Sequence, residues 1–443
     1  MANLAILKLV WPLALGMVNN AVMQFCDRAF LSHWSMEALE AVLPAGMLMW
    51  IFAGFFQSAI GYSSVFVGQF HGAKETEKCT ESYRAATLIA AVSGVASLPI
   101  LPFGEWVLSL FAPSPRVLDC EVAYFGATMS GAFFLYVQIA AAAYFTGLGR
   151  TRTVFWVNLA GNLLNIALDP IFIFVLDLGI AGAAAATVLS MALQAATLAF
   201  AAERAIRRER GAAPARPFPL RERLSLAARM LRFGVPSGLY TVLNILSFTI
   251  FVFITGGVGE MELAVSNACF TVNYLLFAPM EGFAIGASTL VAQAKGRGDP
   301  AAAARDARRV LLLGTGFAAA ASALAVAFCH PILSLFAARA GSAAAEFHSL
   351  GFTLFLLMAA WQVFDSADVI LSGALRGGGD THFVMWWMLA NSFGLWLPAV
   401  WVLSRVDNTM PALWSSMVAY VAILCVGTAV RWRGGKWKSI KVA

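Results

Sequence analysis

Charged side chains are scarce in this chain of 443 residues. Asp, Glu, Lys and Arg make up 12% of it and hydrophobic residues 60%, whereas a soluble domain carries about 25% charged residues. The sequence contains no Gly-x-x-x-x-Gly-Lys-Ser/Thr phosphate loop, no His-Glu-x-x-His motif and no nucleophile elbow, and its five histidines are scattered. The composition therefore excludes a soluble protein. The missing motifs disfavour both ATP-driven transport and a membrane enzyme.

Cysteine is also sparse, with six residues in all. None of them forms a Cys-x-x-Cys motif, and most lie in apolar stretches. We expect them to be unpaired packing residues rather than redox or metal-binding groups.

Long apolar runs are what the chain has instead. A helix needs roughly 20 apolar residues to cross the hydrocarbon of a bilayer, and about twelve runs reach that length. They lie near residues 7–31, 41–67, 85–112, 121–146, 153–176, 180–202, 231–256, 264–293, 308–337, 347–372, 381–404 and 409–431. The first run is too long for a signal peptide and lacks a small-residue cleavage site, so we expect it to remain as the first helix. The sequence thus predicts an all-α integral membrane protein.

The two halves of the chain repeat one another. At one constant offset, Pro12, Ser64, Gln69 and Gly72 recur as Pro236, Ser288, Gln293 and Gly296. At a slightly larger offset, Gly147, Gly149, Thr151 and Trp156 recur as Gly377, Gly379, Thr381 and Trp386. An internal repeat of this length is typical of transporters built from two related lobes. We expect an amino-terminal lobe at 1–202 with helices 1–6, a cytoplasmic linker at 203–230, and a carboxyl-terminal lobe at 231–443 with helices 7–12 and a short basic tail.

The basic residues are distributed unevenly between the two predicted sides. The termini and the even-numbered connections hold 26 of the 30 Lys and Arg residues. The positive-inside rule then places both termini in the cytoplasm of a multi-pass protein in the cell inner membrane. The net charge of +6 is explained by topology signals and contacts with lipid headgroups, without nucleic acid.

A glycine cluster, Gly377 to Gly379, separates the tenth and eleventh predicted helices. It is better explained as a tight cytoplasmic turn than as a nucleotide-binding loop. We expect Asp380 or Thr381 to cap the helix that follows.

Polar residues inside the apolar spans carry the functional information, because hydrocarbon makes them costly. In the fifth span, Asn158, Asn162, Asn165 and Asp169 are spaced 4, 3 and 4 residues apart, which places them on one helical face. Pro170 follows at once and cannot donate a backbone hydrogen bond. Further polar residues in the other spans are Asn20, Gln24 and Asp27 in the first, Asn244 in the seventh, Asn273 and Glu281 in the eighth, and Gln362, Asp365 and Asp368 in the tenth.

Two structural explanations compete with a functional one. Asparagine stripes can join helices by hydrogen bonds without binding a ligand. Asp27 is followed by Arg28, so a membrane-edge ion pair is possible, although neighbouring residues of a helix point about 100° apart.

Several segments together resemble the multidrug and toxic compound extrusion (MATE) transporters of the multidrug/oligosaccharidyl-lipid/polysaccharide superfamily. They are Phe25-Cys26-Asp27, residues 67–73 (VGQFHGA), residues 147–151 (GLGRT), residues 165–170 (NIALDP) and residues 373–381 (GALRGGGDT). The resemblance covers nearly the whole chain. It implies twelve helices in two pseudo-symmetric six-helix bundles forming a V, and export of organic cations or amphiphilic drugs in exchange for H+ or Na+.

The resemblance also implies a cation site in the amino-terminal lobe, at positions that match Asp27, Asn165, Asp169 and Thr187, where either H+ or the metal ion Na+ would bind. Depth supports this set, because Asp27 lies 19 residues after Lys8 and Asp169 lies 17 residues after Arg152, which are about 28 and 26 Å of helix.

Other residues receive weaker roles from the same resemblance. The tenth-helix aspartate of the family matches Asp365, whereas a seventh-helix glutamate of some members is replaced by Asn244, for which Glu281 is a possible substitute. The candidates for substrate or a second cation are Asn20, Gln24, Asn162, Asn244, Glu281, Asp365 and Asp368. Pro170 is the candidate hinge. We expect a monomer that meets small cationic molecules and membrane lipids and uses no cofactor besides the coupling ion.

Two other functions remain open from the sequence alone. A flippase of the same superfamily would move a lipid-linked glycan and would need a cationic cavity for phosphates, whereas the charges inside the spans here are mainly acidic. An enzyme that modifies membrane lipids would need a convergent catalytic set, which the sequence does not reveal.

Overall fold

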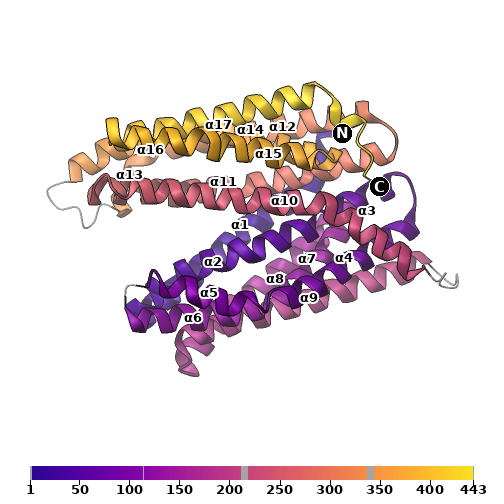
Figure 1. The fold of residues 1–443 in the computed structure, drawn as a ribbon, viewed down its shortest axis with the longest axis horizontal. Coiled ribbons are helices and arrows are strands. Elements are labelled where there is room, and N and C mark those ends of the chain that lie inside the picture. Colours follow the sequence, from indigo (N-terminus) through magenta and orange to yellow (C-terminus); the bar gives the residue numbers. More distant parts are fainter. Residues whose placement is uncertain (1, 113, 211–217, 337–343, 443) are drawn as a thin grey trace. The chain divides into compact units, whose positions relative to one another are not determined.

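The computed structural model describes residues 2–112, 114–210, 218–336 and 344–442, which are almost wholly helical (Figure 1). Ten helices in these ranges are long and apolar enough to cross a membrane, and two bent helix pairs raise the number to as many as twelve. The prediction of an all-α, multi-pass membrane protein with about twelve spans is confirmed.

The amino-terminal half has two consecutive bent helix pairs, with unbroken spans before and after them. Its helices are α1 (Ala2–Trp34), α2 (Met36–Gly61), α3 (Ser63–Gly72), α4 (Thr76–Ala96), α5 (Ile100–Ser109), α6 (Pro115–Ser130), α7 (Ala132–Gly147), α8 (Thr151–Pro170) and α9 (Gly179–Arg210), with a π-helical segment, η1 (Ile171–Val175), directly after α8. The pairs α4–α5 and α6–α7 are bent by 50° and 41°. Pro99 stands at the first of these breaks, where its missing N–H interrupts the helical ladder.

The carboxyl-terminal half has longer unbroken helices. They are α10 (Leu220–Thr255), α11 (Glu260–Gly296), α12 (Pro300–Ala327), α13 (Cys329–Phe336), α14 (Ala344–Gly378), α15 (Thr381–Asn391), η4 (Ser392–Trp396, π-helical), α16 (Leu397–Val406), α17 (Met410–Arg433) and the short η5 (Lys436–Lys438). The segment predicted as a linker is helical on both sides, because α9 continues to Arg210 and α10 already begins at Leu220. Its middle, 211–217, lies outside the described residues.

The helices group into two units. The amino-terminal unit comprises Leu15–Val242, Ala292–Asp299 and residue 442, and the carboxyl-terminal unit comprises residues 2–14, Leu243–Val291 and Pro300–Lys441. Helices α1 and α10 therefore each contribute to both units. The last turn of α11 belongs to the amino-terminal unit, and the first turns of α1 belong to the carboxyl-terminal unit.

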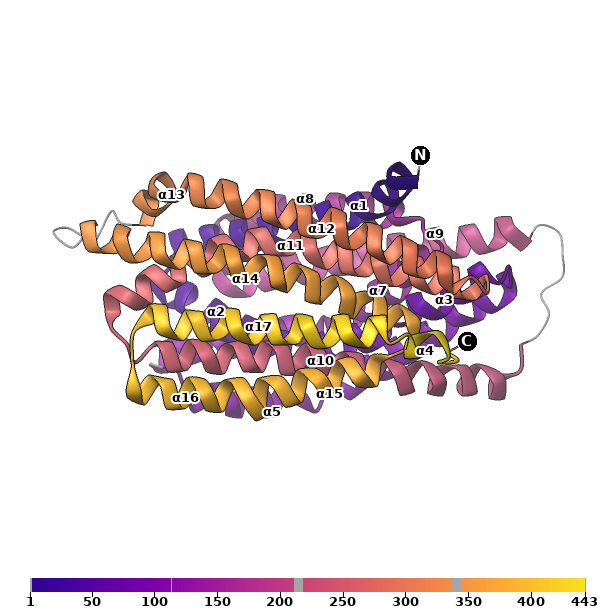
Figure 2. The same cartoon turned by 90° about the horizontal axis from the view of Figure 1, so that it is seen from above.

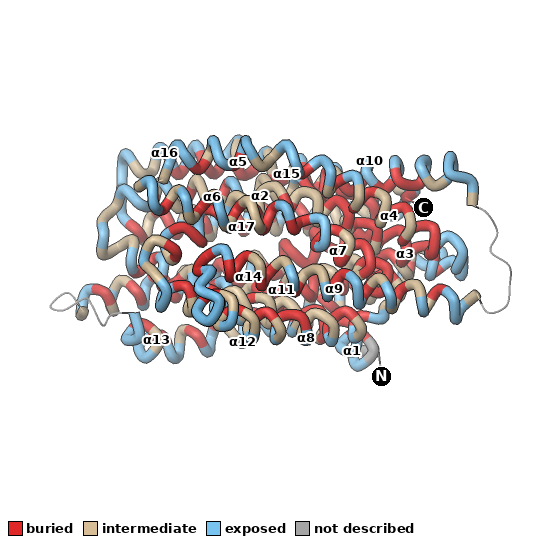
Figure 3. The backbone as a smooth tube through the Cα atoms, turned by 90° about the horizontal axis from the view of Figure 1, so that it is seen from below, coloured by how far each residue is buried: buried red, intermediate tan, exposed pale blue. Residues whose placement is uncertain are grey.

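Each unit is held together by long helix pairs. In the amino-terminal unit α2 packs on α6, and α7 packs on α4 and α9; Figure 3 shows the buried residues concentrated around α3, α4 and α7. In the carboxyl-terminal unit α14 packs between α12 and α17, and these helices run side by side in Figure 2. Small residues allow the backbones to approach, as expected where lipid removes the hydrophobic drive between helices.

Glycines of the repeat mark two equivalent close approaches. A Cβ atom at Gly147 would lie 2.6 Å from the carbonyl oxygen of Ser64, and a Cβ at Gly377 would meet the carbonyl oxygen of Ser288. Ser64 and Ser288 are themselves a repeated pair. Both units thus pack the end of one span against another through the same glycine position.

A third close approach joins α3 to the last turn of α11. The nearest neighbour of a Cβ at Gly68 would be the Cβ of Ala292, at 3.1 Å. A Cβ at Gly72 would collide with the backbone of Gln293, and a Cβ at Gly296 would collide with the backbone of Gln69. Since each of these contacts joins a position of one repeat to a position of the other, the crossing is reciprocal.

The glycine cluster forms the expected turn, but the expected cap is not made. Gly379 has φ of 96°, a conformation that favours glycine. Asp380 occupies the N-cap position of α15 without a side-chain cap hydrogen bond. Its carboxylate instead accepts hydrogen bonds from Arg431 at 2.7 and 3.1 Å, because a charged, bidentate partner outcompetes a backbone N–H.

Candidate cation site

Four polar side chains from three helices converge in the amino-terminal unit. Asp27 comes from α1, Asn165 and Asp169 from α8, and Thr187 from α9, and all four are buried, Asn165 and Asp169 completely. The four-residue spacing of Asn165 and Asp169 aligns them on the face of α8 that packs against α9. The structure therefore brings together all four residues that the sequence assigned to one site.

Asn165 is at the centre of the cluster. Its amide nitrogen lies 3.4 Å from the Thr187 hydroxyl and 3.5 Å from Asp169 Oδ1. With the amide turned over, its NH₂ donates to Asp27 Oδ1 at 3.0 Å and its oxygen accepts from the Thr187 backbone N–H at 3.3 Å, an arrangement that satisfies both ends. Asn165 thus contacts the other three residues of the cluster.

The two carboxyl groups lie within hydrogen-bonding reach of each other. Asp169 Oδ2 is buried and has no hydrogen-bond partner in the described ranges, which is costly unless a proton or cation occupies it. Two carboxylates, an amide oxygen and a hydroxyl form a hard oxygen donor set that suits H+ or Na+. Among the described residues, no group of three or more His, Cys, Asp and Glu side chains has an arrangement that could hold a metal ion.

The alternative role for Asp27, an ion pair with Arg28, does not describe its environment. Arg28 is exposed whereas Asp27 is buried. Within the described part of the chain no ion pair joins them, and the Asp27 side chain faces α8. Asp27 therefore belongs to the buried cluster and not to the surface.

The backbone beside Asp169 departs from a regular α-helix. Pro170 ends α8, and the π-helical segment η1 follows it. The Leu176 N–H donates to the Ile171 carbonyl oxygen at 2.8 Å, five residues back. Such π segments loosen the helical ladder and are frequent at functional sites, so the predicted hinge position coincides with a local irregularity.

A second polar layer lies further along the same helices. Asn162 donates to Asn20 Oδ1 at 2.7 Å. Gln138 of α7 donates to Asn158 Oδ1 at 3.1 Å and to Gln194 Oε1 of α9 at 2.8 Å. These residues hydrogen-bond helix to helix, which is the role that the sequence held open for the asparagine stripe.

Gln138 and Gln194 were not identified from the sequence, although each is a single amide in an otherwise apolar run, a signal that could have found them. Gln24, one turn from Asp27, is half-exposed. It lies on the same face of α1 without being enclosed by the cluster.

In the carboxyl-terminal unit the polar candidates make separate contacts, and Asn273 donates to Gln362 Oε1 at 2.9 Å. Asp368 accepts a hydrogen bond from Thr428 of α17 at 2.8 Å. Asp365 is half-buried and within electrostatic range of Asp368 and Glu281. Asn244 is exposed on α10, so the structure does not bring it into a buried cluster.

Aromatic rings occupy the middle of this unit. Phe251 is fully buried and stacks on Trp396 at 5.1 Å between ring centroids. Trp396 in turn stacks on Tyr420 at 4.2 Å, and Phe270 stacks on Trp414 at 4.7 Å. The offset that carries Pro12 onto Pro236 also carries Asp27 onto Phe251, so the repeat places an aromatic ring where the other half has a carboxylate.

Comparison with protein families gives a match to each half of the chain. Residues 12–171 and 236–402 both match the family model described as MatE. The two matched segments start at Pro12 and Pro236, the first pair of the internal repeat. The chain is also 28% identical over 334 residues to a probable multidrug resistance protein NorM of Rhizobium meliloti (strain 1021), which covers 72% of this chain and 69% of that protein.

Solved structures share the fold. An outward-facing multidrug resistance MATE family transporter of the MOP superfamily matches with a TM-score of 0.86 and 21% identity, covering 99% of this chain and 97% of the other. A MOP superfamily transporter from Pyrococcus furiosus Vc1 (DSM3638), for which a reverse polarity of the binding pocket suggests a different function, matches with a TM-score of 0.84 and 19% identity over the same shares.

Proposed function

Because the chain belongs to the MatE family of multidrug transporters, we propose that it is a secondary active antiporter that exports organic cations or amphiphilic drugs in exchange for H+ or Na+. The observation that carries this proposal is the convergence of Asp27 and Asp169 in a buried cluster with Asn165. Two buried carboxyl groups attract a cation strongly, since charges interact more strongly away from water.

The coupling ion is the cargo of this cluster. H+ or Na+ would be held by the carboxylates of Asp27 and Asp169, the amide oxygen of Asn165 and the hydroxyl of Thr187, and would relieve the repulsion between the two acids. Asp169 is the residue directly before Pro170 and η1, so binding of the cation changes the charge beside this irregular stretch of helix. A change of helix conformation at this stretch would then couple ion binding to alternating access, in which the substrate site opens to the other side of the membrane and releases the drug.

The remaining parts of the proposal follow from chemistry outside this cluster. The excess of Lys and Arg on one side supports an inner-membrane protein with both termini in the cytoplasm. Asp365, with Asp368 and Glu281 in electrostatic range, gives the carboxyl-terminal unit an acidic region that would attract a cationic substrate or a second ion. The proposed transporter works as a monomer and uses no cofactor.

The direct test is efflux from everted membrane vesicles with Na+ and H+ gradients imposed separately. We expect uptake of a fluorescent organic cation into the vesicles with at least one of the two gradients and without ATP. Transport that continues when both gradients are collapsed, and stops when ATP is depleted, would contradict the proposal. Empty vesicles from cells without the protein provide the background.

A further inference from the structure

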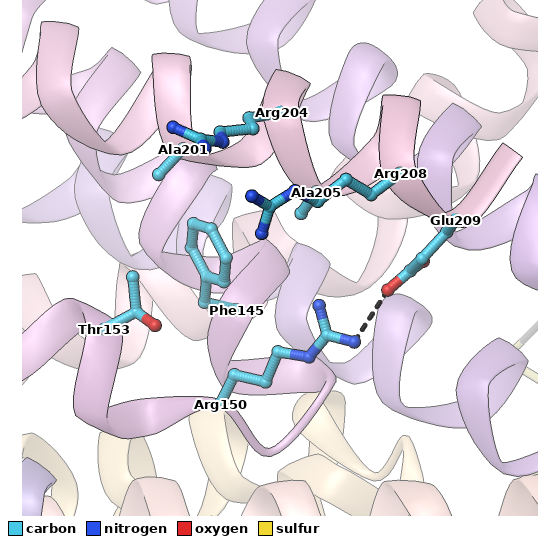
Figure 4. Close-up of a pocket in the computed structure, with 8 residues that line it drawn as sticks. All are labelled: Phe145, Arg150, Thr153, Ala201, Arg204, Ala205, Arg208 and Glu209. Carbon is cyan, nitrogen blue, oxygen red and sulfur yellow. Dashed lines mark hydrogen bonds and ion pairs between the residues drawn. The ribbon is translucent and has the colours of Figure 1, made fainter. Parts of the chain in front are cut away.

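The end of α9 and the turn between α7 and α8 line an open pocket that the proposed antiport does not use. Its volume is about 480 Å³, within the range of small-molecule sites. Three arginines and one glutamate line it, namely Arg150, Arg204, Arg208 and Glu209, with Phe145 and Thr153 between them. Figure 4 shows Arg150 and Arg208 on facing sides of this space, with the Phe145 ring beside them. All lining residues belong to the amino-terminal unit.

The pocket carries an excess of positive charge. Arg150 donates to Glu209 Oε1 at 2.7 Å, which neutralises that pair. Arg204 and Arg208 have no ion-pair partner within the described ranges, and they stand one turn apart on the same face of α9. Two neighbouring guanidinium groups repel each other, and an anion bound between them relieves that repulsion.

The C-terminal dipole of α9 explains only part of this arrangement. Basic residues in the last turn of a helix are stabilised by its negative end, and Arg208 is such a residue. Arg204 lies six residues before the end of the helix at Arg210, beyond the range of that effect. The first turn of α8 contributes Thr153 to the same pocket, and the positive end of that helix's dipole adds further positive potential.

The surface next to the pocket is apolar and exposed. Phe200, one turn before Arg204 on the same face of α9, is 69% exposed, and Leu193 is 45% exposed further along. Trp156, one turn into α8, is 59% exposed. Exposed apolar residues in a membrane protein face lipid tails, and tryptophan gathers where tails meet headgroups. The pocket therefore lies at the headgroup level of the leaflet that the basic residues assign to the cytoplasm.

We propose that this pocket binds the phosphate group of an anionic membrane phospholipid. Guanidinium forks match the geometry of phosphate oxygens, and basic pockets between spans on the cytoplasmic side suit anionic headgroups. The acyl chains lie along Phe200 and Leu193. Glu209 limits the affinity, since it withdraws Arg150 from the anion. This lipid site is independent of the coupling-ion site in residues and in ligand.

The test compares lipid binding to the purified full-length protein in nonionic detergent by native mass spectrometry. Phosphatidylglycerol and phosphatidylcholine with identical acyl chains serve as probes. We expect the first to bind about tenfold more tightly or more. The variant R204Q/R208Q should lose about thirtyfold of the phosphatidylglycerol affinity, at about 1 kcal/mol for each arginine, and keep its phosphatidylcholine affinity.

A matched control removes the same charge elsewhere. Arg207 and Arg229 are exposed residues of the same basic surface and do not line the pocket, so R207Q/R229Q should change the affinity less than about twofold. Glu209→Gln should act in the opposite direction and tighten phosphatidylglycerol binding, because it frees Arg150. This change of sign would not follow from a merely structural role of the pocket.

Three outcomes would overturn the proposal. They are equal affinity for the two lipids, equal losses in R204Q/R208Q and R207Q/R229Q, and weaker binding to Glu209→Gln. Competition by millimolar inorganic phosphate or glycerol phosphate would keep the phosphate chemistry but assign the pocket to a soluble anion, and its absence supports the lipid. Efflux by the same variants is measured separately, so failure of the lipid site is distinguishable from failure of the antiport.

Discussion

The two units carry different chemistry at equivalent places of the same repeat. In the amino-terminal unit Asp27 meets Asn165 and Asp169, a buried set of oxygen ligands. In the carboxyl-terminal unit the position equivalent to Asp27 is Phe251, which stacks on Trp396. The helices repeat, whereas the polar centre does not.

A second equivalent position changes less. Gln138 and Asp368 are related by the same offset as Gly147 and Gly377. Each hydrogen-bonds a side chain on the last long helix of its half of the chain, Gln194 on α9 and Thr428 on α17. The hydrogen bond between the helices is present in both halves, but the ionisable Asp368 stands where the other half has the neutral Gln138. In this fold the two copies keep equivalent backbone contacts and equivalent sites of helix-joining hydrogen bonds, whereas the buried cluster of Asp27, Asn165 and Asp169 is present in one copy.

Removing a carboxylate from the amino-terminal cluster should have the largest effect. We expect Asp27→Asn and Asp169→Asn each to lower coupled efflux more than about tenfold, because loss of one charge changes the affinity for a cation by several kcal/mol in a buried site. The measurement is gradient-driven efflux in vesicles at matched expression. The double variant should be no worse than either single one if the two acids act as a unit.

The control for these variants is Asp177→Asn. Asp177 is exposed and has φ of 58°, a conformation that asparagine also tolerates, so its efflux should remain near the wild-type rate. Wild-type efflux by both Asp27→Asn and Asp169→Asn would show that the amino-terminal cluster joins helices only, and the contrast between the units would lose its functional meaning.

The aromatic centre should matter for stability rather than for coupling. Phe251→Ala removes a fully buried ring from the stack with Trp396, and large-to-small changes of this kind cost about 3–5 kcal/mol in soluble proteins. We expect a clearly lower thermal unfolding temperature in detergent, with efflux per folded molecule retained. Phe253→Ala, at a ring that is 75% exposed on the same helix, is the control and should leave the temperature nearly unchanged.

Asp365 provides a finer test of the contrast. If the acidic region of the carboxyl-terminal unit attracts substrate, Asp365→Asn should lower efflux about fivefold, equivalent to about 1 kcal/mol for a charge that acts at a distance. The exposed Asp407→Asn is a suitable comparison. Unchanged efflux by a well-expressed Asp365→Asn protein would show that Asp365 binds neither the substrate nor a coupling ion.

The smallest effect is expected for the second polar layer. Gln138→Leu removes two hydrogen bonds, to Asn158 and Gln194, and such bonds between membrane helices average about 0.6 kcal/mol each. A slight decrease in unfolding temperature with normal coupling should result. Thr197→Val, which removes only a bond to its own helix, is the reference. A loss of coupling in Gln138→Leu would extend the ion pathway into this layer.

The sequence predicted those features that depend on local spacing. Apolar length predicted the spans. The family resemblance implied the cluster, and the four-residue spacing of Asn165 and Asp169 and the depth of Asp27 on its own helix supported it. Features that depend on partners far along the chain were not predicted. Asp380 was expected to cap α15, yet its partner is Arg431, 51 residues away. The stack of Phe251 on Trp396 likewise joins helices whose contact no periodicity reveals.

The reciprocal crossing of α3 with the end of α11 limits how the two halves of the chain could change during evolution. Gly72 faces the backbone around Gln293, and Gly296 faces the backbone around Gln69, with no room for a methyl group at either position. After the ancestral gene doubled, a new side chain in one copy would have displaced the main chain of the other. The two copies were free to diverge at other positions, as Asp27 and Phe251 show. At this crossing, a larger side chain in either copy would displace the backbone of the other.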